Sequence, residues 1–103
     1  MTICKYTDSA KRDLQDIIEH IITHSGKPQT LKYLDEIERT TIILSQNPNI
    51  GIVRNYIYPT LLSFAIKKHV VYYLKQKEGI IVIRILHSSI CTRLHSFSNI
   101  DKL

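Results

Sequence analysis

Residues 70–87 have the sequence VVYYLKQKEGIIVIRILH and indicate the class of fold. It is rich in Val, Ile and Tyr, and its apolar residues form unbroken runs or alternate with a period of two, which is typical of β-strands. Lys77-Glu78-Gly79 separates the two apolar runs and predicts a turn. Residues 70–75 and 80–87 are therefore expected to form an antiparallel hairpin.

Two further strands are expected upstream of this hairpin. Residues 63–68 have the same strand-like pattern, and Lys67-Lys68-His69 is the expected bend between them and the hairpin. Residues 2–6 form a short alternating segment, which predicts a first strand.

Two amphipathic helices are expected between the first strand and the others. Thr7 or Asp8 is suited to cap the first helix, whose apolar stripe consists of Ala10, Leu14, Ile17, Ile18, Ile21 and Ile22. The segment Ser25-Gly26-Lys27-Pro28 ends this helix and begins the next. The second helix extends to about Ser45, with a stripe of Leu31, Leu34, Ile37, Thr41 and Leu44. So short a connection predicts an antiparallel helical hairpin.

These elements predict an α+β fold of the order β-α-α-β-β-β. In this fold the antiparallel helical hairpin packs on one face of a small, mainly antiparallel sheet. With 103 residues and neither a linker nor a repeat, the chain is expected to form a single domain over residues 1–103.

The last strand predicts apolar surfaces on both faces of the sheet. Strict alternation places Ile81, Ile83 and Ile85 on one face, and we expect this face to pack under the helices. The opposite face would carry Ile80, Val82, Arg84 and Leu86. Because that face is too apolar for water, it needs cover from residues 88–103, a second subunit or a binding partner.

The composition is that of a globular protein, with 44% hydrophobic and 22% charged residues. No apolar run approaches the roughly 20 residues needed to span a bilayer. The first residues lack the layout of a secretory signal, and two cysteines are too few for a disulfide scaffold. We therefore expect a cytoplasmic protein.

The charge is unevenly distributed along the chain. Residues 1–50 contain six Lys or Arg and seven Asp or Glu, whereas residues 51–103 contain eight and two, within a net charge of +5. This asymmetry indicates an acidic partner for the C-terminal half, either nucleic acid or an acidic protein. A solvated basic surface without a partner would give the same pattern.

Common catalytic signatures are absent from the sequence. There is no Gly-rich phosphate loop, no Cys-x-x-Cys pair and no Gly-x-Ser-x-Gly elbow. Two sets with a spacing of four could suggest a metal: Asp16, His20 and His24, and His87, Cys91 and His95. The first lies on a polar helix face without a fourth ligand, and nothing fixes the second segment as a helix. No metal or cofactor is therefore predicted.

The motifs match one known family along nearly the whole chain. The matching residues are Tyr6, Ala10, Asp13, Leu14, Ile17, Ile21, Gly26, Tyr33, Leu44, Pro48, Gly51, Arg54, Ser63, Phe64, His69, Val70, Tyr72, Tyr73 and the ending Arg84-Ile85-Leu86-His87. On these residues the chain resembles the ParE-type toxins of the RelE/ParE toxin–antitoxin superfamily.

The resemblance implies a toxin that arrests growth by binding DNA gyrase, through its A subunit with DNA, and that cleaves no bond. It also implies neutralisation by a short, acidic cognate antitoxin in a hetero-oligomer, within a module for plasmid or genome maintenance. The basic C-terminal half and the family ending point to target-binding residues Arg84, His87, Arg93, Lys67 and Lys68. The antitoxin is expected to cover the apolar sheet face and the helical hairpin through Phe64, Ile66, Tyr72, Val82 and Leu86.

Three alternatives remain open. A ribosome-dependent mRNA endonuclease of RelE type would assemble a phosphate-reading cleft from Lys67, Lys68, Arg84, and Tyr72 or Tyr73. An inactivated toxin that only binds antitoxin would fit two departures from the family: Leu62 replaces an Arg, and Ile90-Cys91-Thr92-Arg93 lacks an Asp. An unrelated basic nucleic-acid binder would show salt-dependent affinity for DNA without any antitoxin.

Overall fold

The computed structural model describes residues 3–89 and confirms the predicted α+β architecture. Its elements are, in order, β1 (Ile3–Tyr6), α1 (Asp8–Ser25), α2 (Lys27–Gln46), the 3-10 turn η1 (Pro48–Ile50), β2 (Ile52–Val53), β3 (Leu62–Ile66), β4 (His69–Gln76) and β5 (Gly79–His87). The short elements η1 and β2 were not predicted, because segments of three and two residues show no recognisable periodicity.

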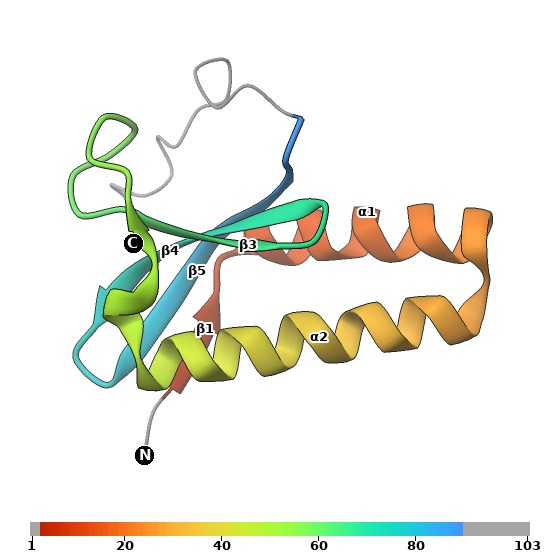
Figure 1. Ribbon diagram of the computed structural model, residues 1–103, viewed down its shortest axis with the longest axis horizontal. Helices are drawn as coiled ribbons and strands as arrows, with labels where there is room; N and C mark the ends of the chain where they lie inside the picture. The colour runs from red at the N-terminus through yellow and green to blue at the C-terminus, as the bar shows by residue number, and fades with distance from the viewer. Residues whose placement is uncertain (1–2, 90–103) are drawn as a thin grey trace.

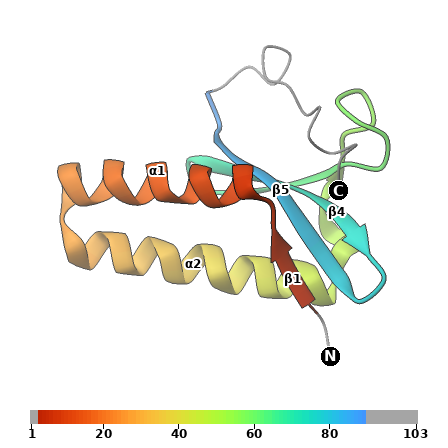
Figure 2. The same cartoon turned by 180° about the vertical axis from the view of Figure 1, so that it is seen from behind.

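The sheet has five strands in the order β1-β5-β4-β3-β2. Strands β2 to β5 form antiparallel neighbours in chain order. The first strand, β1, lies at the edge beside the last strand, β5, and pairs with it in parallel. The two helices run side by side as an antiparallel hairpin (Figures 1 and 2) and cover one face of the sheet. The mainly antiparallel sheet is thus confirmed, with β2 and β1 at its two edges.

Thr7 connects the start of α1 to the middle of β5. Its hydroxyl oxygen accepts a hydrogen bond from the backbone N–H of Ala10 at 3.0 Å, which caps the helix. The same hydroxyl donates to the backbone carbonyl of Ile83 at 2.8 Å. One side chain therefore fixes both the first turn of the helix and its position on the sheet.

A β-bulge at Ile83 changes which residues of β5 face the helices. Tyr72 pairs with Arg84 but Tyr73 pairs with Val82, so Ile83 is an extra residue on β5. The alternation shifts at this point, and Ile80, Val82 and Ile85 pack against the helices. The prediction for Ile85 is confirmed, but the prediction that Ile81 and Ile83 lie under the helices is wrong.

The other face of the sheet has a small core of its own. It consists of Leu61, Tyr72, Ile83 and Leu86, with Ile57, Tyr58, Val70, Leu74 and Ile81 packed against them. Ile57, Tyr58 and Leu61 belong to the segment between β2 and β3, so this segment contributes to the cover that the apolar face requires. This segment was not among the predicted covers, which were residues 88–103, a second subunit or a binding partner.

The helices bury less of their predicted stripes than expected. Ala10 and Ile17 of α1, and Ile37, Thr41 and Leu44 of α2, are buried as predicted. Ile22 and Leu31, by contrast, are 47% and 57% exposed. Both lie toward the end of the hairpin where α1 meets α2. No helix within residues 3–89 is long and apolar enough to cross a membrane.

Candidate functional site: a cleft lined by histidines

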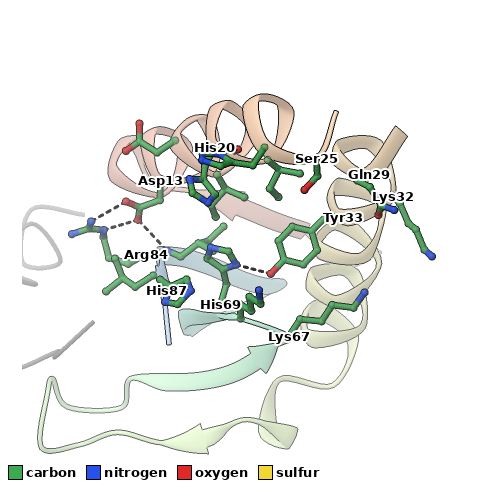
Figure 3. A pocket seen from close by; sticks show the side chains of 17 residues that line it. Asp13, His20, Ser25, Gln29, Lys32, Tyr33, Lys67, His69, Arg84 and His87 are labelled. Carbon is green, nitrogen blue, oxygen red and sulfur yellow. Dashed lines mark hydrogen bonds and ion pairs between the residues drawn. The ribbon is translucent and has the colours of Figure 1, made fainter. Parts of the chain in front are cut away.

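A cavity with a volume of about 780 Å³ lies between the helical hairpin and one end of the sheet (Figure 3). Its walls are formed by α1, the start of α2, the β3–β4 turn, the start of β4 and the end of β5. We call it the histidine cleft, and its polar lining consists of Asp13, Asp16, His20, His24, Ser25, Gln29, Lys32, Tyr33, Lys67, Lys68, His69, Arg84 and His87.

His69 is fixed by Tyr33 of α2. The Tyr33 hydroxyl lies 3.0 Å from the backbone carbonyl of Ile66 and 2.6 Å from Nδ1 of His69. A carbonyl oxygen can only accept, so the phenol donates its hydrogen to Ile66 and accepts one from Nδ1 of His69. Burial raises the pKa of Tyr33, with Glu36 adding to the effect, which keeps this donor protonated. The Nε2 atom of neutral His69 then carries a lone pair.

His87 at the end of β5 has the opposite tautomer. The backbone N–H of Ser89 donates to Nδ1 of His87 at 3.1 Å, and the Ser89 hydroxyl lies 2.7 Å from the same atom. Because Nδ1 accepts the backbone hydrogen bond, the proton of the neutral ring lies on Nε2. His87 is exposed, so this N–H group is accessible to solvent.

The two rings are neighbours in the histidine cleft. Their centroids are 5.3 Å apart in an edge-to-face arrangement, because the register of β4 and β5 places His69 opposite His87. Burial lowers the pKa of His69, and the nearby His87 and His20 lower it further. A neutral His69 with a free lone pair therefore lies beside a hydrogen-bond donor on His87.

Two lysines come from the tight β3–β4 turn. Ile66 pairs with His69, so Lys67 and Lys68 form the two-residue connection. Lys67 adopts a positive φ of 51°, and its ammonium group forms an ion pair with Glu36 of α2 at 3.0 Å. Lys68 has no acidic partner within residues 3–89.

Arg84 is held at the rim of the cleft by α1. Its guanidinium donates two hydrogen bonds to the Asp13 carboxylate, from Nε at 2.7 Å and from a terminal nitrogen at 2.8 Å. The hydrogen bonds to Asp13 raise the pKa of Arg84, so the group stays charged. This bidentate pair directs the Arg84 guanidinium toward α1. Two of its N–H groups donate to Asp13 and are therefore not available to a ligand.

The family model described as ParE toxin of type II toxin–antitoxin system, parDE, matches residues 4–90. The chain belongs to the ParE toxin family. Among solved structures, a chain of the chromosomal ParDE TA system from P. aeruginosa is similar in fold, with a TM-score of 0.71 and 24% sequence identity. The match covers 84% of this toxin and 96% of that chain. No curated protein sequence is significantly similar.

The structure of this ParE toxin brings four of the five predicted target-binding residues to one place. Lys67, Lys68, Arg84 and His87 all line the histidine cleft. The fifth, Arg93, lies outside the described residues, as do Cys91 and His95 of the second histidine spacing. The cleft also contains His69, Tyr33 and His20, which were not predicted as site residues. They come from three different elements, and no local spacing connects them.

The five residues predicted to bind the antitoxin lie on both sides of the sheet. Ile66 and Val82 are buried under the helices with Phe64 packed beside them, whereas Tyr72 and Leu86 are buried on the opposite face. Val82 has no exposed surface. In this structure these side chains stabilise the fold and form no common surface.

The predicted endonuclease cluster is only partly assembled. Lys67, Lys68 and Arg84 share the histidine cleft, but neither tyrosine lines it. Tyr73 is fully buried and donates its hydroxyl hydrogen to the carbonyl of Pro48 at 2.7 Å, and Tyr72 belongs to the core on the other face.

The first histidine spacing also has a structural explanation in this toxin. His20 and His24 stack with centroids 4.2 Å apart, and Nδ1 of His24 donates to the carbonyl of His20 at 2.7 Å. Among residues 3–89, no group of three His, Cys, Asp or Glu side chains could hold a metal ion.

Proposed function

We propose that this protein is the toxin of a toxin–antitoxin pair that arrests growth by binding DNA gyrase in the cytoplasm. The observation that supports this proposal is the family match over residues 4–90. The concentration of basic residues in the C-terminal half supports an acidic target such as the DNA held by gyrase. The separation of Tyr72 and Tyr73 from Lys67 and Lys68 also favours binding over the predicted cleavage chemistry.

In this proposal the histidine cleft contacts the gyrase–DNA complex. Lys68 and His87 offer exposed donors on one side of the cleft. Arg84 contributes indirectly, because its bond to Asp13 positions β5 against α1. Its role is therefore that of a positioning residue.

We further propose that the antitoxin covers residues 42–56. Within this segment Ile42, Ile43, Ile50, Ile52, Val53 and Tyr56 are between 45% and 69% exposed. Strand β2 lies at an edge of the sheet, where its backbone can pair with an added strand. A short antitoxin segment with apolar residues would cover these side chains and extend the sheet.

A supercoiling assay tests the target. Purified toxin is titrated into gyrase, relaxed plasmid and ATP, and a gel records both the loss of supercoiling and the trapping of cleaved DNA. The proposal expects inhibition that the cognate antitoxin reverses. Lys68→Gln should weaken the inhibition, whereas Lys77→Gln, the same charge change in the distant β4–β5 turn, should not. Unimpaired gyrase with folded toxin in excess would exclude this target.

A second candidate function is cleavage of mRNA on the ribosome. The adjacent rings of His69 and His87 favour it, since phosphodiester cleavage requires an acid and a base and histidine is the side chain that most often supplies them. A translation reaction programmed with a labelled mRNA distinguishes the two functions. Site-specific cleavage that is lost in His87→Gln would favour the endonuclease.

A further inference from the structure

We propose that the histidine cleft is a binding site for a phosphate group of a nucleic-acid backbone, with Lys68 and the Nε2–H of His87 as its main donors. The inference goes beyond the proposed function, because it names the chemical group that the cleft recognises. It applies whether that backbone is DNA held by gyrase or another nucleic acid.

The charge of the cleft supports an anionic ligand. Two of its cations are already neutralised, since Lys67 pairs with Glu36 and Arg84 with Asp13. Lys32 and Lys68 also line the cleft, and neither forms an ion pair within residues 3–89. Asp16 is the one carboxylate of the lining that opposes them without an ion pair in the described chain. The unpaired charge is therefore positive.

The hydrogen-bond donors are already oriented. Ser89 occupies Nδ1 of His87, so Nε2 carries a hydrogen whether the ring is neutral or charged. Lys68 follows Lys67 in a two-residue turn and its carbonyl accepts a hydrogen bond from the backbone of Ser88. This bond holds the turn beside the end of β5, so Lys68 and His87 lie on the same edge of the cleft.

The size and the aromatic rings favour a nucleotide over an isolated anion. A volume of about 780 Å³ falls within the roughly 300–1,000 Å³ typical of small-molecule sites. Rings of His20, Tyr33 and His87 line the cavity and offer surfaces on which a base can stack (Figure 3). An acidic protein segment would contact the same lysine, but its carboxylate side chains cannot stack on these rings as a base does.

The test is direct binding of a labelled 12-nucleotide single strand, as DNA and as RNA, to the purified full-length toxin by fluorescence anisotropy. His87→Gln and Lys68→Gln should each weaken binding by about 5- to 10-fold, and loss of the Lys68 charge should reduce the salt slope by about 0.7. Lys77→Gln is the matched control and should change affinity by less than about 2-fold. Circular dichroism and a thermal melt of each variant establish that it is folded.

Competition identifies the ligand class. Inorganic phosphate should displace the strand only at high concentration, and a glutamate-rich peptide of equal charge should compete poorly. Equal losses in His87→Gln, Lys68→Gln and Lys77→Gln would mean a diffuse basic surface and would overturn the inference. Stronger binding of the acidic peptide than of the strand would overturn it as well, in favour of a protein interface.

The gyrase assay distinguishes a failure of the phosphate site from a failure of the proposed gyrase target. Strand binding that depends on His87 and Lys68, without any inhibition of gyrase, would retain the phosphate site and reject the target. Gyrase inhibition by a toxin that binds neither strand would reject the phosphate site and retain the target.

Discussion

Asp13 of α1 accepts three hydrogen bonds from two adjacent residues of β5. Two come from the Arg84 guanidinium at 2.7 and 2.8 Å, and the third comes from the backbone N–H of Ile85 at 3.0 Å. The side chains of Arg84 and Asp13 are 22% and 12% exposed, so the pair is largely shielded from water. Pairing between β1 and β5 ends at Val82. Beyond Val82, the Asp13 carboxylate accepts the backbone hydrogen bond of Ile85 that a neighbouring strand would otherwise accept.

Asp13→Ala should therefore destabilise the fold. It removes the acceptor of three hydrogen bonds and leaves the Arg84 charge and the Ile85 N–H without partners, which costs about 2–4 kcal/mol. Urea unfolding measures this loss, with Asp16→Ala as the control on the same helix. Arg84→Ala combined with Asp13→Ala should cost less than the sum of the single changes. Equal stability of wild type and Asp13→Ala would show that the ion pair has no structural role.

Acid should destabilise the toxin through His69. Its pKa is lowered in the folded state, mainly by burial, so the unfolded chain binds the proton more readily. The free energy of unfolding should then fall as the pH decreases from about 6.5, the unfolded value, to the lowered pKa of the folded protein. His69→Gln should remove this part of the slope in urea titrations between pH 7.5 and 5, and His24→Gln should not. A slope that persists in His69→Gln would assign the effect to another group.

His69 and His87 should show opposite tautomers near neutral pH. We expect the proton of His69 on Nδ1, facing Tyr33, and that of neutral His87 on Nε2. Nitrogen-15 chemical shifts of the imidazole rings distinguish these forms. Tyr33→Phe should release the constraint on His69 and leave the His87 tautomer unchanged. Finding His69 protonated on Nε2 would remove the base from the endonuclease alternative.

Gly79→Ala should be poorly tolerated. Gly79 has a φ of 154°, and a Cβ atom there would meet the backbone of Ile3 in the paired strand β1. Because backbone cannot move aside as a flexible side chain can, we expect β1 to separate from β5 and the thermal midpoint to drop by several degrees. Gly26→Ala, whose Cβ would meet only the Pro28 ring at 3.9 Å, controls for the positive φ without the clash. Similar melting of both variants would argue against the clash.

A charge on the exposed edge strand should weaken the antitoxin complex. Ile52 is 59% exposed, so Ile52→Asp should leave the isolated toxin folded. Calorimetric titration with the cognate antitoxin should show affinity reduced by more than 10-fold, since a buried, unpaired carboxylate is costly. Ile22→Asp, at an exposed position at the other end of the molecule, should bind normally. Normal binding of Ile52→Asp would place the antitoxin elsewhere.

Local patterns in the sequence predict the order and nature of the main elements correctly. Ala10 and Ile17 belong to an apolar stripe at helical spacing in α1, and Ile37 belongs to another in α2. The apolar runs in β4 and β5 have the composition of strands, so local patterns were sufficient to predict these elements. The family ending Arg84-Ile85-Leu86-His87 also pointed to Arg84 and His87 as site residues, and both line the cleft. These features depend on contacts between near neighbours in the chain.

The faces of β5 and the composition of the site depend instead on contacts between residues far apart in the chain. Strict alternation failed at Ile83 because a bulge, bonded to Thr7 76 residues away, adds one residue to the strand. The cleft joins Tyr33 and His69, which are 36 residues apart, and Asp13 and Arg84, which are 71 apart. Periodicity reports a residue's position within its own element, whereas pairing across the fold depends on how the helical hairpin docks on the sheet.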